Sequence, residues 1–426
     1  MSVFAKASAS RSRRIVVGGI ALVGATVLAL SACATPTPTE PEGPSGPIED
    51  YTMTLGTLLP QTGNLAFLGP PEEAGVLMAA AEVNEASADT GVTVEITLGD
   101  SGNTDNKAYE TEAPRVLAEG VSAIIGAASS GTSLQFIDQV VGEGVIQFSP
   151  ANTSDAFTTY DDNGLYFRTA PSDVLQGEVL GNLIAEDGNA TLGMIVLNDS
   201  YGTGLAKYVT DAFEAAGGEV VAQPTYNTGD TNFTTQISEV LAAAPDAIAL
   251  ITFDEVATIL PGILGQFPAD KLYFVDGNLK NFGDAFAAGS LTGAKGTLPG
   301  LSIDSLGDFT GQLDEFVAAE GLPALEDYSY AAESYDAVIL LALASLAAGG
   351  STEGVDIAAK LQEVSGGSGD GEKCTTYADC AAIIVGGGVA DYDGISGPIT
   401  FDEVGDPTEA SIGIYVYEDS NNYVAY

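Results

Sequence analysis

The sequence predicts an α/β protein built as two lobes, each around a parallel sheet. Short apolar runs alternate with helix-like stretches from Tyr51 onward, which is typical of strand–helix–strand units. The same alternation starts again near Thr191, and a chain of 426 residues is too long for one ordinary core. We therefore expect two α/β lobes in series.

Residues 1–32 are expected to be a lipoprotein signal peptide. Four basic residues precede the apolar run of 15–30, and "LSAC" follows it, ending at Cys33. This ending resembles the lipobox of bacterial lipoproteins, in which the cysteine becomes the lipidated N-terminus. A transmembrane anchor is the alternative, but the run is shorter than the roughly 20 residues that a span needs.

Residues 33–50 are rich in Pro, Thr, Gly and Glu and are expected to be a tether, because they cannot bury a core. Four of the 13 basic residues lie in 1–32, which hold no acid, so the remainder carries a net charge of −50. Such a surface repels nucleic acid and anionic lipid. We expect membrane association through the lipid anchor alone.

The cysteine and histidine content limits the chemistry. Cys374 and Cys380 lie in "EKCTTYADC", and in an exported protein this pair favours a local disulfide over a metal site. The chain contains no histidine, so a Ser-His or Cys-His catalytic pair cannot form and zinc or copper sites are not expected. We expect no catalytic residues, no metal and no cofactor.

The individual elements follow the alternation. Pro and Glu in the first turn mark the first helix, and β-like runs flank it. In the first lobe the expected strands are 51–60, 92–101, 121–127 and 145–153, and the expected helices are 70–86, a stretch ending near 117, and 132–144. In the second lobe, strand and helix alternate through 191–221, 234–264 and 271–279.

Loops at the carboxyl ends of parallel strands are where such sheets hold ligands. The candidate loops share hydroxyl, amide, carboxylate or aromatic groups and contain no Lys or Arg. They are 61–69, 127–132, 149–154, 198–204, 253–255 and 276–278. A multiply charged anion normally recruits Arg or Lys, so we expect a neutral or zwitterionic ligand.

Eight motifs carry a resemblance to a known family. They are "LLPQTGNLAFLG", "IIGAASSGTS", "SPANTS", "YFRTAPSD", "NDSYGTG", "YNTGDTNFTTQISEVLAAAPDAIAL", "YAAESYDAVILLA" and "YDGISGPITFDEVGD". Their order resembles that in type I periplasmic binding proteins, most closely the leucine/isoleucine/valine-binding branch, which are solute receptors of ABC importers. The resemblance covers nearly all of 51–426.

The resemblance implies two Rossmann-like lobes joined by a hinge that the chain crosses three times. We place these crossings near 168–171, 297–302 and 391–397. Lobe 1 is then expected to comprise 51–169 and 299–392, and lobe 2 to comprise 170–298 and 393–426.

The resemblance also implies which groups hold an amino acid carboxylate. Ser130 or its neighbour Ser129, together with Ala151 and Thr153, would bind it where a strand feeds a helix N-terminus. The alternative for the two serines is plain helix capping, which serine performs routinely.

The ligand's ammonium group needs an acid. We expect Glu255 to supply it, or Asp254 if the alignment is shifted by one residue, with Asp276 as a second candidate. An acidic first helical turn is the alternative explanation for the first two.

Aromatic side chains complete the implied site. Tyr201 matches the family's aromatic residue at the mouth of the second lobe, and Phe67 and Tyr328 could add apolar wall or belong to the core. The late Cys pair departs from the branched-chain receptors, which carry a disulfide in the first lobe.

The resemblance implies a non-enzymatic, monomeric lipoprotein on the outer face of the bacterial cytoplasmic membrane. It would deliver a branched-chain or related amino acid, a short amide or urea to an ABC permease and its ATPase. A sensor subunit that signals to a membrane partner is the alternative. An exported serine hydrolase is disfavoured, since the chain lacks histidine and a G-x-S-x-G elbow.

Overall fold

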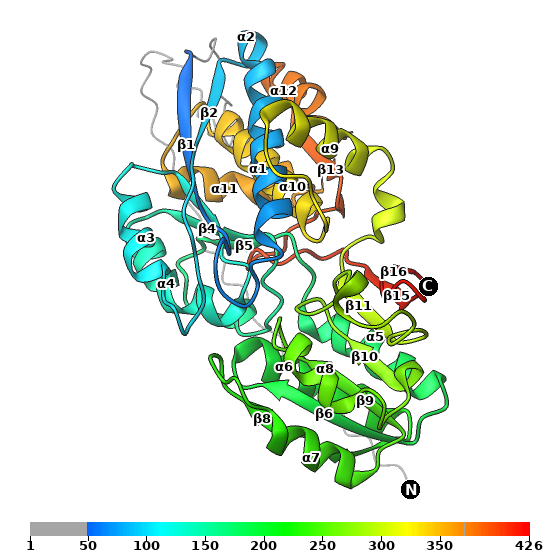
Figure 1. Cartoon of the computed structure of the whole chain (residues 1–426). Helices are drawn as coiled ribbons and strands as arrows, with labels where there is room; N and C mark the ends of the chain where they lie inside the picture. Colours follow the sequence, from blue (N-terminus) through cyan, green and yellow to red (C-terminus); the bar gives the residue numbers. More distant parts are fainter. Residues whose placement is uncertain (1–48, 370) are drawn as a thin grey trace, which may run out of the picture. The chain divides into compact units, whose positions relative to one another are not determined.

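The computed structural model describes residues 49–369 and 371–426, which form two α/β lobes (Figure 1). The expected signal peptide, nearly all of the expected tether and Cys33 lie outside the described residues. None of the described helices is long and apolar enough to cross a bilayer.

The first lobe contains a five-stranded parallel sheet in the order β2-β1-β3-β4-β5. Separate apolar clusters lie on its two faces, one with α1 and α10 and the other with α3 and α4. Its elements are β1 (Tyr51–Leu58), α1 (Gly69–Glu85), α2 (Ser87–Thr90), β2 (Val92–Thr97), α3 (Tyr109–Leu117), β3 (Ala123–Gly126), α4 (Ser130–Gly142), β4 (Ile146–Ser149), β5 (Tyr166–Arg168), α9 (Phe309–Glu320), α10 (Ala331–Ala347), α11 (Gly354–Val364), β12 (Glu372–Cys374), α12 (Tyr377–Val385), β13 (Ala390–Gly394) and β14 (Gly397–Pro398).

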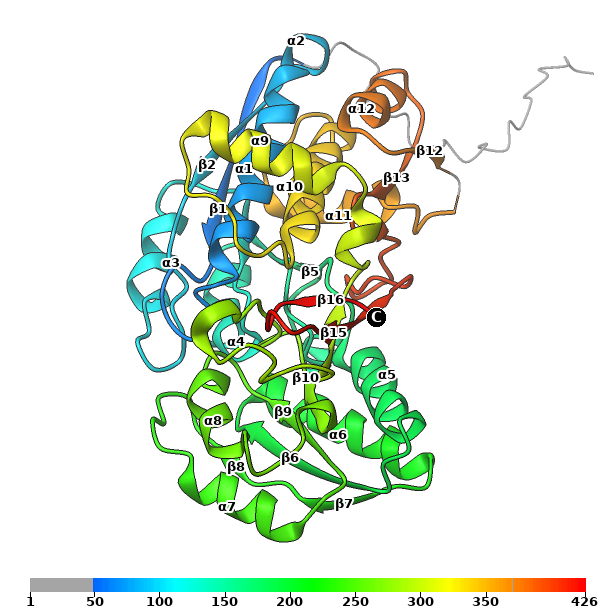
Figure 2. The same cartoon turned by 45° about the vertical axis from the view of Figure 1, so that its right-hand side comes forward.

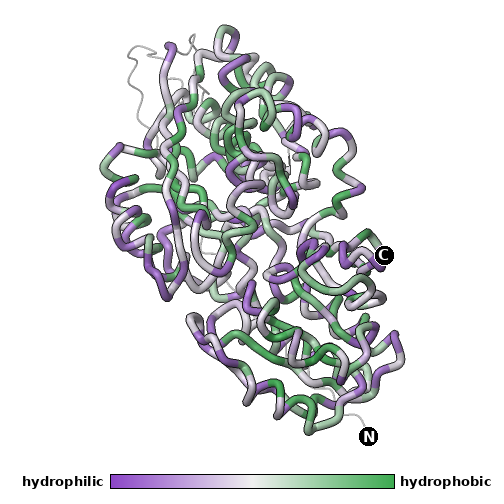
Figure 3. The backbone as a smooth tube through the Cα atoms, in the orientation of Figure 1, coloured by the Kyte–Doolittle hydropathy of each residue, from purple (hydrophilic) through white to green (hydrophobic). Residues whose placement is uncertain are grey.

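Helix α10 is the apolar centre of the first lobe. Every residue from Ala331 to Leu346 is buried, and the helix is hydrophobic along most of its length (Figure 3). A helix that is apolar all round must be enclosed by other elements. Helix α1 approaches it so closely that a Cβ at Gly75 would collide with the carbonyl oxygen of Ala331, so this contact requires glycine.

The second lobe contains the sheet β16-β15-β11-β10-β9-β6-β7, with β8 also paired to β6. Its elements are α5 (Asp173–Glu186), β6 (Thr191–Leu197), α6 (Ser200–Ala215), β7 (Glu219–Ala222), β8 (Thr225–Tyr226), α7 (Thr234–Ala243), β9 (Ala247–Ile251), α8 (Val256–Ile263), β10 (Leu272–Phe274), β11 (Lys295–Pro299), β15 (Ile412–Tyr417) and β16 (Tyr423–Ala425).

The α/β prediction is confirmed, but the second sheet is mixed rather than parallel throughout. Strand β15 is antiparallel to β11, and β16 is antiparallel to β15. In Figure 2 these two strands, in red, lie beside the strands of the second lobe. The chain returns from the first lobe for its last segment, and a return without a crossover helix produces antiparallel pairing.

Three chain crossings join the lobes, after β5, after β11 and before β15. The expected boundaries at 169/170 and 298/299 lie beside the ends of β5 and β11. The expected boundary at 392/393 lies inside β13, which pairs with β14 beyond it. Because Phe401 also packs in the core of the first lobe, we place the last crossing after Phe401.

Arg168 connects the first crossing to the third. Its side chain is fully buried, and Nε and Nη2 donate to Asp406 Oδ1 and Oδ2 at 2.6 and 2.8 Å. Its Nη1 donates to the carbonyl oxygen of Ser154 at 2.7 Å, and its backbone N–H donates to the carbonyl oxygen of Gly405 at 3.1 Å. A bidentate charged pair of this kind fixes geometry as well as charge. Arg168 is therefore fully engaged in the hinge.

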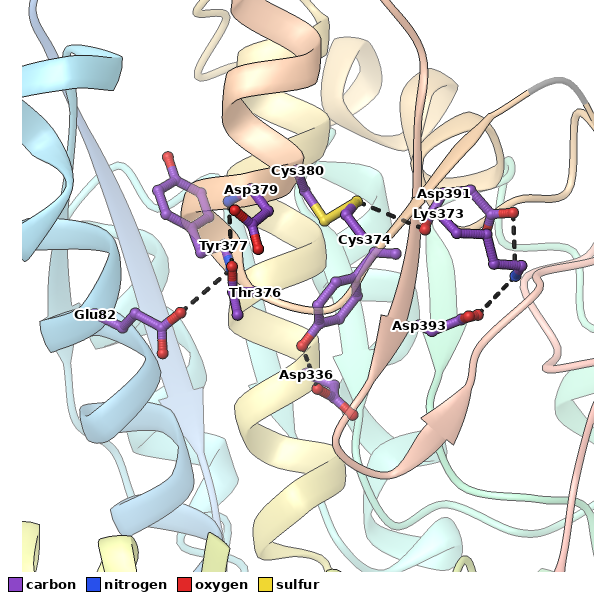
Figure 4. The surroundings of a disulfide bond; sticks show 11 residues. Glu82, Asp336, Lys373, Cys374, Thr376, Tyr377, Asp379, Cys380, Asp391 and Asp393 are labelled. Carbon is purple, nitrogen blue, oxygen red and sulfur yellow. Dashed lines mark hydrogen bonds and ion pairs between the residues drawn. A yellow bond between two sulfur atoms is a disulfide. The ribbon is translucent and has the colours of Figure 1, made fainter. Parts of the chain in front are cut away.

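Cys374 and Cys380 form a disulfide that joins β12 to α12, with their Cα atoms 5.3 Å apart (Figure 4). Around it, Tyr392 donates a hydrogen bond to Asp336 at 2.6 Å, and the backbone of Tyr377 donates to Glu82 at 3.3 Å. No group of three or more His, Cys, Asp or Glu side chains suited to a metal occurs in the described part of the chain.

Candidate ligand-binding site

A small cavity lies between the lobes, at the carboxyl ends of both sheets. It encloses about 10 Å³, which is room for no more than one water. Small-molecule pockets usually measure about 300–1,000 Å³, so this cavity is far smaller than such a pocket. The first lobe contributes Leu65, Leu68, Ala128, Ser129, Ser130, Ala151 and Tyr330 to the lining, and the second contributes Tyr201, Phe253, Asp276 and Gly277.

Asp276 is the acid of this cavity. It follows β10 and is 5% exposed. Its Oδ1 accepts hydrogen bonds from Tyr201 Oη at 2.6 Å and from Gln176 Nε2 at 3.0 Å, and its Oδ2 accepts one from Tyr330 Oη at 2.9 Å. Burial raises the pKa of Asp276, while the hydrogen bonds from Tyr201, Gln176 and Tyr330 oppose that rise. All three partners are neutral, so the carboxylate is hydrogen-bonded without a balancing positive charge.

The N-terminus of α4 forms the opposite end of the cavity. Ser129 is the N-cap residue, and its side chain accepts a hydrogen bond from the backbone of Thr132 at 3.2 Å. The hydroxyl oxygen of Ser130 accepts from the backbone N–H groups of Thr153 and Ser154 at 3.3 and 3.2 Å. Both serines line the cavity. Ser129 therefore both caps α4 and lines the cavity.

Ala151 and Thr153 differ in their position. Ala151 lines the cavity, and its backbone N–H donates to Ser149 Oγ at 3.2 Å. Thr153 lies behind the lining, where its carbonyl oxygen accepts from the backbone of Asp173 at 2.7 Å. Thr153 supports the position of Ser130 through its backbone.

Tyr201 and Phe253 form the aromatic wall from the second lobe. Their rings stack with centroids 5.1 Å apart, and both line the cavity. A Cβ at Gly277 would collide with the Phe253 ring, so glycine is needed beside this wall. The aromatic pair gives the cavity an apolar side next to Asp276.

Glu255, the acid first expected to bind the ligand, does not line the cavity. Its Oε1 accepts a hydrogen bond from Asn64 Nδ2 at 2.8 Å, and its Oε2 accepts one from Tyr226 Oη at 3.1 Å. Asp254 is exposed and forms an ion pair with Lys280. The backbone turn after β9 directs these two acids away from the cavity, whereas the turn after β10 directs Asp276 into it.

Phe67 and Tyr328 also lie outside the lining. Lys280 Nζ lies 5.4 Å from the centre of the Phe67 ring, and the Tyr328 hydroxyl donates to Asp314. Both side chains are only partly buried and pack against the apolar clusters of the lobes.

Four residues of the site were not identified from the sequence. Tyr330 precedes α10 with a φ of 61°, which is uncommon for a residue other than glycine. Gln176 lies inside α5, and Leu65 and Leu68 belong to the loop before α1. Leu65 and Leu68 lie in the candidate loop of 61–69, whereas Tyr330 and Gln176 lie outside every candidate loop.

The two ends of the cavity differ in electrostatic character. No Lys or Arg lines it among the described residues. The α4 end offers backbone N–H groups and a hydroxyl under a positive helix-dipole end, whereas the Asp276 end offers a carboxylate. This arrangement is complementary to a ligand with one negative and one positive group.

Comparisons with known proteins agree with the fold. A family model described as "Periplasmic binding protein" matches residues 52–377. The leucine-, isoleucine-, valine-, threonine- and alanine-binding protein of Pseudomonas aeruginosa is 31% identical over 199 residues, which cover 45% of this chain and 53%, about half, of that relative. The Leu/Ile/Val-binding protein homolog 1 of Brucella abortus is 26% identical over 321 residues, covering 73% of this chain and 82% of that protein.

Among solved structures, the branched-chain amino acid transporter substrate binding protein LivJ of Streptococcus pneumoniae, in complex with isoleucine, matches with a TM-score of 0.66. It is 20% identical, and the match covers 88% of this chain and 100% of that one. Because the family model matches most of the chain, the expected membership is confirmed: the chain belongs to the type I periplasmic binding proteins, in the branch that contains the Leu/Ile/Val-binding proteins.

Proposed function

We propose that the protein is an extracytoplasmic solute-binding component of an ABC importer and that it binds a neutral, zwitterionic amino acid between its lobes. One observation carries the ligand class. Asp276, which has only neutral hydrogen-bond partners, shares a cavity with the N-terminus of α4. An ammonium group would pair with Asp276, and a carboxylate with the N-terminus of α4.

The residue roles follow from this geometry. Asp276 takes the ammonium role first assigned to Glu255 or Asp254, and Ser129, Ser130 and the loop at Ala151 take the carboxylate. Tyr201 and Phe253 would cover the side chain of the solute. The names of the relatives point to branched-chain and small amino acids, which suits an aromatic wall without charge.

The solute is expected to bind between separated lobes and to hold them together on closure. The family binds solutes, and the proposed function requires no chemical change in the ligand. We further propose that a permease and its ATPase receive the solute, that the receptor acts as a monomer, and that lipid on Cys33 holds it at the outer face of the cytoplasmic membrane.

A calorimetric panel tests the ligand class. The full chain should bind one or more of leucine, isoleucine, valine, threonine and alanine, and should not bind glutamate, citrate or phosphate. Mass spectrometry of the recovered solute should find it unchanged. Tight binding of a multiply charged anion, or a product formed from the solute, would overturn the proposal.

A further inference from the structure

A second, larger cavity lies at the hinge and shares no lining residue with the ligand cavity. Its volume is about 250 Å³. All three crossings contribute to its wall, through Thr169 and Pro171, through Gly300 and Leu301, and through a last segment that includes Ser411. The cavity is therefore in contact with all three segments that join the lobes.

Glu333, in the first turn of α10, is the buried acid of this cavity, whereas the other acid of its lining, Glu409, is exposed. The residue is 6% exposed, and its carboxyl Oε1 lies against Gly300 of the second crossing. Its backbone carbonyl accepts a hydrogen bond from Thr169 Oγ1 at 3.0 Å. Within residues 49–369 and 371–426, no Lys or Arg forms an ion pair with the Glu333 carboxyl group.

The groups that face Glu333 do not supply a positive charge. Glu72 of α1 and Asp336 of α10 are acids, and Tyr330 and Tyr415 are neutral phenols. Burial raises the pKa of Glu333 to about 8, and Asp336 adds to the rise. The cavity therefore presents a carboxyl group that lacks a counterion.

We propose that the hinge cavity binds a small protonated amine, with the carboxylate of Glu333 as its counterion. Pro171, Leu301 and Ile399 line the same cavity and suit the alkyl part of such a ligand. A bare metal cation would need several oxygen ligands, and no suitable group of three acidic or sulfur side chains occurs in the described residues. The buried carboxylate of Glu333 in a partly apolar cavity suits one ammonium group.

Occupancy of this site affects the hinge, because its walls come from all three crossings. An amine that fits one lobe arrangement better than the other shifts the balance between them. By reciprocity, the solute that closes the lobes would change the affinity for the amine by the same factor. The amine is thus a regulator that acts at a distance from the solute cavity.

The binding depends on pH in a defined direction. The carboxyl group of Glu333 must lose its proton, and the raised pKa places this step near pH 8. The amine must keep its proton, which an alkylamine does up to about pH 10. Affinity therefore falls by about tenfold for each pH unit below 8, and it falls again above about pH 10 as the amine loses its proton.

Ethylammonium chloride is the probe for the test, titrated calorimetrically into the full chain in detergent at pH 7, 9 and 11. Binding is expected to be tightest at pH 9 and to be lost in Glu333→Gln. An exposed acid outside the cavity offers a matched control, and Glu320→Gln should bind ethylammonium as the wild type does. Potassium chloride at equal ionic strength should not compete.

Two further measurements keep the proposal testable if Glu333→Gln fails to fold. Ser411→Phe, at the exposed rim, should block the cavity while Glu333 remains, and ethylammonium should lower the carbon-13 titration midpoint of Glu333 in the wild type. Absence of binding at pH 9, equal binding by Glu333→Gln or by Ser411→Phe, or an unmoved midpoint would overturn the proposal. Equal competition by potassium would overturn the amine class.

Discussion

Asn64 and Glu255 form a hydrogen bond between the two lobes. Asn64 Nδ2 donates to Glu255 Oε1 at 2.8 Å, and the carbonyl oxygen of Asn64 accepts from the backbone of Asp254 at 3.1 Å. Asn103 Nδ2 donates to Asn64 Oδ1 at 3.1 Å and fixes the orientation of the amide. Tyr226 Oη holds the other carboxylate oxygen of Glu255. Glu255, the acid that the resemblance implies for the ligand, thus connects the two lobes in this structure.

This contact predicts different effects for two substitutions of Glu255. Glu255→Ala removes the acceptor and should weaken the affinity for the solute about 5- to 30-fold, because a hydrogen bond to a partly exposed charged group contributes about 1–2 kcal/mol. Glu255→Gln keeps an acceptor for Asn64 and should cost much less. Calorimetry gives the affinities, and small-angle scattering gives the fraction of closed protein.

A double-mutant cycle provides the control for this contact. Asn64→Ala should cost about as much as Glu255→Ala, and the pair together should cost little more, because both remove the same bond. If Glu255→Gln is as damaging as Glu255→Ala and the two sites are additive, Glu255 binds the ammonium group and the proposed contact between the lobes is wrong.

The disulfide should be complete in the exported protein. Cys374 and Cys380 are bonded to each other, so thiol labelling of denatured, unreduced protein should modify neither. Replacing both by serine should lower the free energy of unfolding by about 2 kcal/mol, because the pair closes only a short loop. Labelling of both thiols in unreduced protein would contradict the assignment.

Cys33 should carry lipid and form the mature N-terminus. The expectation rests on "LSAC" directly after an apolar run of signal-peptide length. Mass spectrometry of the membrane fraction should find a lipidated Cys33, and Cys33→Ala should leave the protein unprocessed at this position. A wild-type protein that is released unmodified would rule out the lipid anchor.

Glu333 should make stability fall as pH rises. Its pKa rises from the usual 4.5 to about 8 in the folded chain, so between these values the folded state holds a proton that the unfolded state has released. The free energy of unfolding should therefore decrease from about pH 4.5 to 8 and level off above that range. Subtracting the curve of Glu333→Gln from that of the wild type isolates this effect, and parallel curves would show that Glu333 does not titrate there.

The sequence predicts the fold well where local pattern decides it. Apolar runs such as that of β3 mark buried strands, and polar loops at their ends bring Ser129, Ser130, Ala151, Tyr201 and Asp276 to one cavity. The antiparallel pairing of β15 is different, because it depends on the path of the last crossing rather than on the residues of the strand.

The remaining site residues depend on tertiary placement. Tyr330 donates to Asp276 from the position directly before α10, and Gln176 donates to it from inside α5. Neither contact follows from the local sequence pattern. Glu255 and Asp276 both follow apolar strands of the same sheet, so pattern alone cannot rank them. The geometry of each turn decides which acid enters the cavity.

Titration of a neutral branched-chain amino acid into wild type, Asp276→Asn and the exposed control Asp254→Asn tests the central proposal most directly. Loss of a charge partner in a dry site typically costs about 2–5 kcal/mol. Asp276→Asn should therefore bind at least about 30-fold more weakly while Asp254→Asn binds as the wild type does. Equal affinity of Asp276→Asn and the wild type would contradict the assignment of Asp276 as the ammonium partner.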